Sequence, residues 1–174
     1  NLSLRKADYL AVGGFDQSLG QSEDFELGLR LEKAGIPIVY LNDAHVFHGS
    51  DHVDRQFFMS RAQRYGTFES RISHKHPDMT NANPWRYLFQ MNVLARPAVG
   101  AAYVFPSVAE KMISATLVAA EKADEIGLEH LAFRATSIAY TMEYYRGVRA
   151  EAKSMLNGLQ DLARYLKLKR SQND

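Results

Sequence analysis

The sequence predicts an α/β fold with few short strands, followed by a mostly α-helical region, so that helices dominate overall. Two observations lead to this prediction. As far as Ser50, short β-rich runs, glycine turns and one helical segment alternate. From Asp51 onward, apolar residues recur at spacings of three and four, which is the period of an amphipathic helix. We place the domain boundary so that the first part covers residues 1–82 and the helical extension covers residues 83–174.

Three β-rich runs predict the strands of the first part, at residues 2–5, 36–41 and 44–48. Pro37 lacks a backbone N–H, so it limits the second run to a sheet edge or to the start of a strand. The pair Gly13-Gly14 predicts a turn with backbone angles that glycine tolerates because it has no Cβ. We therefore expect a few short strands beside one helix.

That helix is predicted to begin at Ser22, whose hydroxyl can cap the first free amides. Acidic residues fill its first turn, where the helix dipole favours negative charge; they are Glu23, Asp24 and Glu26. Apolar residues at helical spacing predict its buried face; they are Leu27, Leu31 and Ala34. Gly35 then supplies the C-terminal stop.

Capping signals divide the rest of the chain into helices. Starts are predicted at Asp51, at Asn83-Pro84 and at a capping box of Ser107 with Glu110, and stops at Gly66 and Gly127. Two apolar stripes follow, one of Leu128, Leu131, Ala135, Ile138, Met142 and Tyr145, and one of Ala152, Met155, Leu159, Leu162 and Leu166. Amphipathic helices must bury such stripes, so we expect a packed antiparallel bundle rather than a cofactor site.

Composition excludes several classes of protein. The formal net charge of +1 gives no basic excess, so we expect no nucleic-acid partner. The absence of cysteine excludes disulfides, thiolate metal sites and cysteine nucleophiles. No uninterrupted apolar run is long enough to span a bilayer, because polar residues break the best candidate at residues 87–106. We expect a cytoplasmic protein and leave open both contact of its helices with a membrane surface and self-association.

The first fifty residues carry motifs in a characteristic order. They are Asn1-Leu-Ser-Leu-Arg5, Val12-Gly-Gly-Phe-Asp16, Ser22-Glu-Asp-Phe-Glu-Leu-Gly-Leu-Arg-Leu31, Ala34-Gly35 and Val46-Phe-His48. This order and spacing resemble the second half of the catalytic domain of glycosyltransferase family 2, which has the GT-A fold. The resemblance continues more weakly through Arg64-Tyr-Gly66 and His76-Pro77. It implies a partial GT-A catalytic domain and transfer of a hexose-like sugar from a nucleotide-sugar donor to a saccharide or lipid-linked acceptor.

The resemblance implies that Asp24 is the catalytic base. Inverting sugar transfer needs a group that takes the proton from the acceptor hydroxyl as this attacks the anomeric carbon. The aspartate of the Glu-Asp pair has this role in the family, and Glu23 beside it is expected to bind acceptor hydroxyls. The alternative is that both carboxylates only complement the helix dipole.

His48 matches a histidine that binds the divalent ion, Mn²⁺ or Mg²⁺, in many GT-A enzymes. A neutral imidazole with hard oxygen ligands suits such an ion, and the alternative is a structural histidine. His45 and His52 lie nearby, but the three histidines match no zinc spacing, so we do not interpret them as a zinc site.

Three further residues are candidates for substrate binding. By resemblance, Gly14 and Phe15 lie beside the sugar, where backbone can approach it and an aromatic ring can stack. Arg64 matches basic residues that reach phosphate in related enzymes. The alternatives are an ordinary turn with a core phenylalanine and a solvated surface arginine.

The same resemblance implies a partner region. A GT-A enzyme has a strand–helix half before this part, which binds the nucleoside and ends in an Asp-x-Asp pair. Without that N-terminal half we expect residues 1–174 alone to be inactive. The alternative to an enzyme fragment is a non-catalytic helical interaction module that retains a glycosyltransferase remnant.

Overall fold

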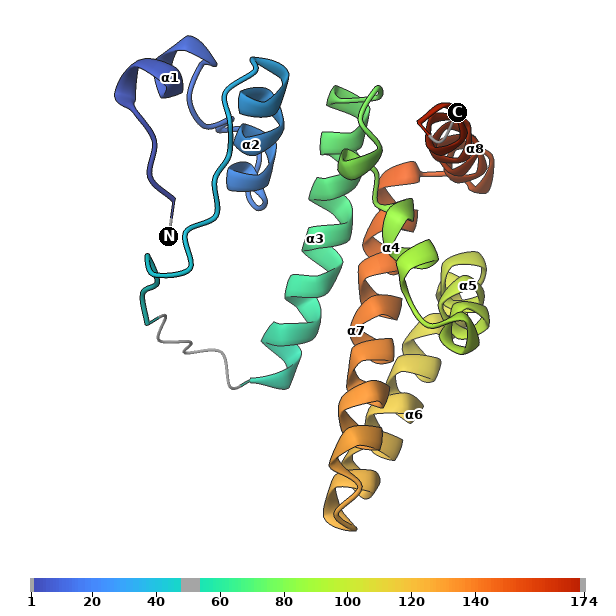
Figure 1. Ribbon diagram of the computed structural model, residues 1–174. Helices are drawn as coiled ribbons and strands as arrows, with labels where there is room; N and C mark the ends of the chain where they lie inside the picture. The colour runs from blue at the N-terminus through green and yellow to red at the C-terminus, as the bar shows by residue number, and fades with distance from the viewer. Residues whose placement is uncertain (1, 48–53, 173–174) are drawn as a thin grey trace. The chain divides into compact units, whose positions relative to one another are not determined.

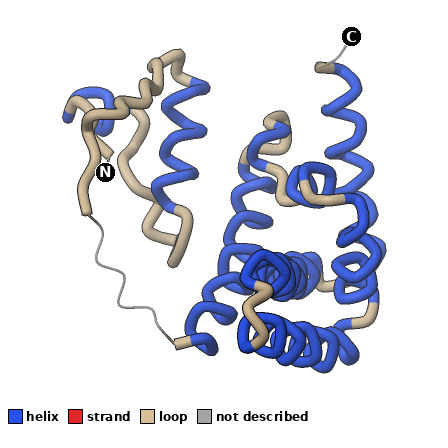
Figure 2. The backbone as a smooth tube through the Cα atoms, turned by 60° about the horizontal axis from the view of Figure 1, so that its bottom comes forward, coloured by secondary structure: helices blue, strands red, loops and turns tan. Residues whose placement is uncertain are grey.

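A computed structural model describes residues 2–47 and 54–172, and every regular element within these ranges is a helix. Figure 2 shows helices joined by loops, with no strand in the described part of the chain. The helices are α1 (Lys6–Ala11), α2 (Glu23–Lys33), α3 (Arg55–Lys75), η1 (Thr80–Ala82), α4 (Trp85–Gln90), η2 (Val93–Ala95), α5 (Arg96–Val104), α6 (Pro106–Glu125), α7 (Glu129–Ala152) and α8 (Met155–Ser171). The expected α/β fold with a partial GT-A domain is therefore wrong, and the described chain is all-α.

The three segments expected to be strands show why the α/β prediction is wrong. Residues 2–5, 36–41 and 44–47 form no strand, and of the last run His48 lies outside the described residues. The β-branched and aromatic side chains of the second run are largely exposed, Val39 at 70% and Tyr40 at 88%. High β-propensity means a good fit against neighbouring strands, so it produces no strand where no paired backbone is present.

The chain divides into two compact units, Asn1–Asp54 and Arg55–Asp174. Each has its own set of elements: α1 and α2 belong to the first, and all the helices from α3 onward belong to the second (Figure 1). The boundary that we expected at residues 82 and 83 falls inside the second unit.

The first unit is organised around α2. Leu27, Leu29 and Leu31 are buried on this helix, whereas Ala34, expected on the same face, is exposed. Gly35 ends the helix as predicted, with a φ of 70° that suits glycine. The predicted cap is wrong, because Ser22 has a left-handed backbone and its side chain makes no capping hydrogen bond.

The second unit is built on close contact between α3 and α7. A Cβ added at Gly66 of α3 would collide with the backbone carbonyl of Tyr144, and one at Gly147 of α7 would collide with that of Gln63. The two helices can therefore approach backbone to backbone only because both positions are glycine. Gly66 was expected to end a helix. Instead α3 runs on to Lys75, and the glycine serves the helix contact.

The hydrophobic core of this unit confirms a packed bundle. Met142 and Tyr145 of the predicted stripe are 1% and 0% exposed, whereas Leu128 and Leu131 at the other end of the stripe are about half exposed. The Tyr145 hydroxyl donates to the carbonyl oxygen of Pro84 at 3.0 Å, which ties α4 to α7.

Of two other predicted helix boundaries, the stop at Gly127 is confirmed and the capping box of Ser107 with Glu110 is wrong. Gly127 follows α6 with a φ of 78°, as a stop requires. The capping box is wrong, because α6 already begins at Pro106 and no side chain caps it.

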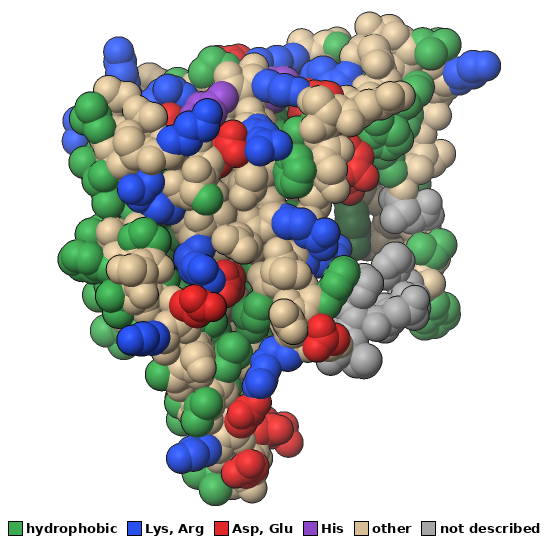
Figure 3. Space-filling view, turned by 180° about the vertical axis from the view of Figure 1, so that it is seen from behind, with side chains coloured by type: hydrophobic (Ala, Val, Ile, Leu, Met, Phe, Trp, Pro, Cys, Tyr) green, Lys and Arg blue, Asp and Glu red, His purple; other side chains and the backbone are tan. Residues whose placement is uncertain are grey.

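The surface carries charges of both signs. Basic and acidic side chains lie interspersed on the face drawn in Figure 3. Within residues 2–47 and 54–172, none of the helices combines the length and the apolarity that a membrane span requires.

Candidate functional site

Arg30 joins the Gly13-Gly14 turn to α2. Its guanidinium forms an ion pair with Glu26, with Nη2 2.7 Å from Oε2, and also donates to the backbone carbonyls of Val12 and Gly14. The Glu26 side chain is only 4% exposed. A guanidinium has several donors in fixed directions, so one side chain can hold a carboxylate and two carbonyls together. The turn is thereby fixed against the helix that carries Asp24.

The turn needs glycine at both positions. Gly13 and Gly14 have φ values of 86° and 71°, and a Cβ at Gly14 would overlap the ring of Tyr9. The Tyr9 hydroxyl accepts a hydrogen bond from the backbone N–H of Phe15 at 3.0 Å, and the two rings meet edge to face at 5.6 Å. Phe15 remains 42% exposed, so part of its ring is open to solvent.

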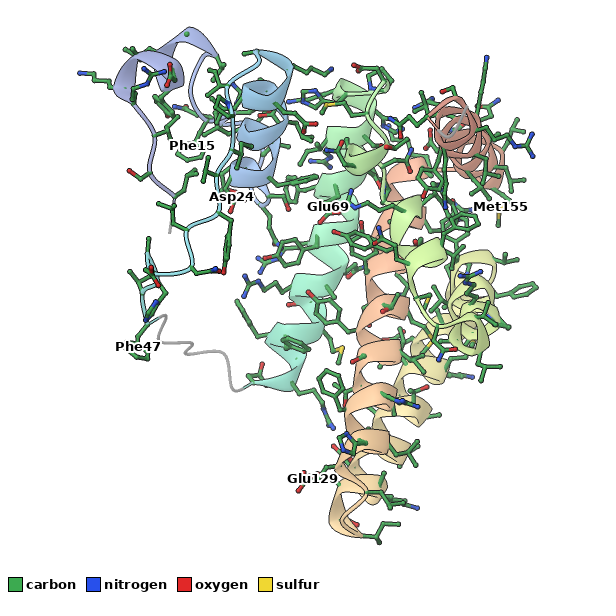
Figure 4. All side chains as sticks on the ribbon, in the orientation of Figure 1. Phe15, Asp24, Phe47, Glu69, Glu129 and Met155 are labelled. Atoms are coloured by element: carbon green, nitrogen blue, oxygen red, sulfur yellow. The ribbon has the colours of Figure 1, made fainter. Side chains whose placement is uncertain are left out.

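The two candidate carboxylates begin α2. Glu23 and Asp24 lie in its first turn and both are exposed, and Figure 4 shows Asp24 at this end of the helix. The Asp24 carboxylate accepts a hydrogen bond from the backbone N–H of Phe25 at 2.7 Å. Glu26, in the same turn, is buried instead and pairs with Arg30. Exposure therefore distinguishes the two residues that could meet a substrate from the one that holds the turn.

The structure thus brings four of the predicted site residues, Gly14, Phe15, Glu23 and Asp24, into one compact unit. Arg64 lies elsewhere, on α3 of the second unit, where it is exposed and its guanidinium carbon is 5.6 Å from the centre of the Phe57 ring. The predicted metal ligand His48 lies outside the described residues. The roles of all six residues remain predictions.

Sequence reasoning missed Arg30 and Glu26 as structural partners. Their spacing of four residues on one helix could have indicated an ion pair. Nothing in the sequence indicates that Arg30 also reaches carbonyls 16 and 18 residues earlier in the chain.

The arrangement of the acidic and histidine side chains bears on the predicted metal site. Within residues 2–47 and 54–172, no group of three or more histidine, cysteine, aspartate or glutamate side chains is arranged to hold a metal ion.

Comparison with known proteins gives one informative similarity. The chain is 40% identical over 63 residues to rhamnosyltransferase WbbL of Escherichia coli strain K12. The matched segment covers 36% of this chain and 24% of that protein. No protein-family model matches the chain, and no solved structure matches it. The similarity supports a glycosyltransferase-like function.

Proposed function

We propose that this chain is part of an inverting glycosyltransferase related to family 2. It would transfer a sugar from a nucleotide-activated donor to a saccharide or lipid-linked acceptor. The observation that carries the proposal is the 40% identity over 63 residues to a protein named as a rhamnosyltransferase. Nucleotide-activated rhamnose is therefore the first donor to test.

Asp24 is the proposed base. In the proposed step its carboxylate takes the proton from the acceptor hydroxyl, and the oxygen of that hydroxyl forms a bond to the anomeric carbon. The bond between that carbon and the donor's phosphate oxygen breaks, and the nucleoside diphosphate leaves with the electron pair. The exposure of Asp24 at the start of a helix supports this role, because a base must reach its substrate from a rigid element.

The neighbouring groups have binding roles in this proposal. Glu23 would accept hydrogen bonds from acceptor hydroxyls, and the exposed ring of Phe15 would stack on a sugar at the Gly14 turn. Arg30 is assigned no contact with substrate; it positions the turn through the carbonyls of Val12 and Gly14.

The proposal includes a divalent ion but assigns no reaction step to it. Mn²⁺ or Mg²⁺ would neutralise charge on the donor diphosphate, with His48 as one ligand. The step above is written with the chemistry of this chain's own side chains alone. Arg64 is kept as a candidate for phosphate binding.

The test is Asp24→Asn in the complete gene product that contains this sequence. Loss of a general base lowers turnover by about 10²–10⁴. Donor affinity, measured by calorimetry, should stay the same because the base acts on the acceptor. Glu32→Gln is the matched control, since Glu32 is an exposed carboxylate on the same helix. It should transfer sugar at the parent rate.

Two results would decide against the assignment. An Asp24→Asn variant with more than half of the parent turnover would exclude Asp24 as the base. If the parent itself transfers no sugar from any nucleotide-activated donor, the helical interaction module becomes the better interpretation.

A further inference from the structure

A cavity of about 550 Å³ lies within the second unit, between α3, α4 and α7. Its walls include four tyrosines, one methionine and one glutamate: Tyr65, Tyr87, Tyr140, Tyr144, Met91 and Glu69. Figure 4 shows Glu69 on α3. The volume falls in the range that small-molecule sites in proteins occupy, about 300–1,000 Å³. No residue of this cavity has a role in the proposed sugar transfer.

The polar groups of the cavity largely satisfy one another. The Tyr144 hydroxyl donates to Oε2 of Glu69 at 2.8 Å, and Nη2 of Arg86 lies 3.5 Å from the same carboxylate oxygen. The Arg86 guanidinium also donates to the Tyr87 hydroxyl at 2.6 Å. The one carboxylate in the wall is therefore paired with a cation, so the cavity offers no unbalanced charge to an ionic ligand.

Two groups of the wall, Glu69 and Tyr144, are buried, whereas the rest of the lining is partly exposed. Removal from water raises the pKa of Glu69, and hydrogen bonding to Tyr144 and the charge of Arg86 oppose this only in part. Burial also raises the pKa of Tyr144 well above its usual value, and the neighbouring Glu69 raises it further.

The walls are held in place before any ligand binds. The rings of Tyr87 and Tyr144 meet edge to face at 5.3 Å, and those of Phe58 and Tyr140 lie 4.8 Å apart. The backbone contact at Gly66 fixes α3 against α7 beside the cavity. A cavity lined by packed rings on rigid helices costs little reorganisation to fill.

Two wall or rim groups keep hydrogen-bonding capacity. The Tyr140 hydroxyl has no hydrogen-bond partner among the described residues, and the exposed side chain of Gln90 also has none there. The remaining wall is mostly carbon. Inside the cavity, a saccharide would find only these two uncommitted groups for its several hydroxyls.

We propose that this cavity binds a neutral small molecule with a hydrocarbon body and one hydrogen-bonding group, such as an aliphatic or isoprenoid alcohol. The ring walls would contact the hydrocarbon, and the Tyr140 hydroxyl would bond the polar group. Such a ligand could be a free molecule or one chain of a lipid. This site lies beyond the proposed glycosyl transfer, so failure of either proposal leaves the other intact.

The experiment is a fluorescence titration of the 174-residue chain with N-phenyl-1-naphthylamine, a neutral hydrocarbon probe with a single N–H. We expect saturable binding that geraniol displaces and methyl glucoside does not. Dihexanoylphosphatidylcholine below its critical micelle concentration serves as a second competitor, because a bilayer would itself take up the probe. Displacement by geraniol alone indicates a free ligand, and displacement by both indicates a lipid chain. Displacement by methyl glucoside, or no saturable binding, would overturn the proposal.

Two variants tie the binding to this cavity. Tyr140→Phe keeps the ring but removes the free hydroxyl, so it should weaken geraniol binding about 3- to 10-fold. It should leave displacement by the hydrocarbon limonene unchanged. Tyr103→Phe is the control, because it removes a buried hydroxyl outside the cavity.

Thr141→Phe, in the wall on α7, fills the cavity and should weaken binding of the probe about tenfold or more. Its circular dichroism and melting temperature report whether it folds. If Tyr140→Phe and Tyr103→Phe have the same geraniol affinity as the parent, or if a folded Thr141→Phe binds the probe as the parent does, the ligand lies elsewhere and the inference is wrong.

Discussion

The acidic residues in the first turn of α2 differ in ways that their positions in the sequence do not reveal. All three suit the positive end of a helix. In the structure, Glu23 and Asp24 are exposed while Glu26 is 3% exposed and paired with Arg30. The sequence could predict the helix start and the candidate carboxylates. It could not predict the contacts of Arg30 with backbone carbonyls, because these depend on how an earlier loop folds back.

Arg30→Lys should loosen the Gly13-Gly14 turn. A lysine ammonium cannot bond the Glu26 carboxylate and two carbonyls at once, so the buried carboxylate loses some of its hydrogen bonds. We expect the backbone amides of Gly14 and Phe15 to exchange with deuterium about tenfold faster or more, which corresponds to about 1.4 kcal/mol.

The control is Arg5→Lys, since Arg5 is 82% exposed and its ion pair with Asp8 lies on the surface. Such pairs contribute little, so exchange at Gly14 should stay at the parent rate. Equal amide exchange in Arg30→Lys and Arg5→Lys would show that the contacts of Arg30 do not hold the turn.

At the scale of elements, helices were predicted well and strands were not. An amphipathic helix forms its hydrogen bonds within itself, so a local stripe such as Met142 and Tyr145 is enough to indicate it. A strand needs a second chain segment to pair with. The exposed run at residues 36–41 has the composition of a strand, but no segment of the described chain pairs with it.

The glycines also differ in whether their role could be predicted from the sequence. Gly35 and Gly127 end helices through positive φ angles, as their positions predicted. Gly66 and Gly147 instead serve a contact between helices that are far apart in the sequence. No local pattern distinguishes the second use from the first.

Gly66→Ala should destabilise the second unit although alanine favours helix. The propensity gain of about 1 kcal/mol is outweighed by collision of the new Cβ with the Tyr144 carbonyl. Forcing an extra carbon into a packed contact costs about 1–3 kcal/mol, and the helices must separate. We expect a lower midpoint in urea denaturation followed by circular dichroism.

Gly100→Ala is the matched control for this prediction. Gly100 lies in α5, and a Cβ there would meet nothing within 4 Å. The substitution should leave the midpoint unchanged or raise it, by at most about 1 kcal/mol in unfolding free energy. A Gly66→Ala variant as stable as Gly100→Ala would mean that α3 and α7 can move apart at no cost.

At the scale of the whole molecule, the two units have different relations to the sequence. The motifs of the first unit predicted its candidate site residues, although not its fold. The cavity of the second unit was not predicted at all, because its tyrosines come from three helices and each looks like an ordinary core aromatic in its own segment. Long-range assembly, rather than local composition, creates that site.

Buried carboxylates of the second unit predict how its stability depends on pH. Burial raises the pKa of both Glu69 and Glu143 above the ordinary value of 4.5. Between that value and the raised pKa, the folded state binds more protons than the unfolded state, so the free energy of unfolding falls as pH rises. The contribution of Glu69 is thus fully present below about pH 4.5 and lost as pH rises through its raised pKa.

Glu69→Gln removes this titration while an amide oxygen can still accept from the Tyr144 hydroxyl. The stability of the parent relative to Glu69→Gln should therefore be greatest near pH 4 and decline toward pH 7, as measured by urea denaturation across that range. Glu129→Gln is the control for loss of a glutamate carboxylate that is not buried, because Glu129 is exposed at the start of α7. A rise in the relative stability of the parent from pH 4 to pH 7 would instead mean that pairing with Arg86 outweighs burial, and Glu69 would then act as a conventional ion-pair partner.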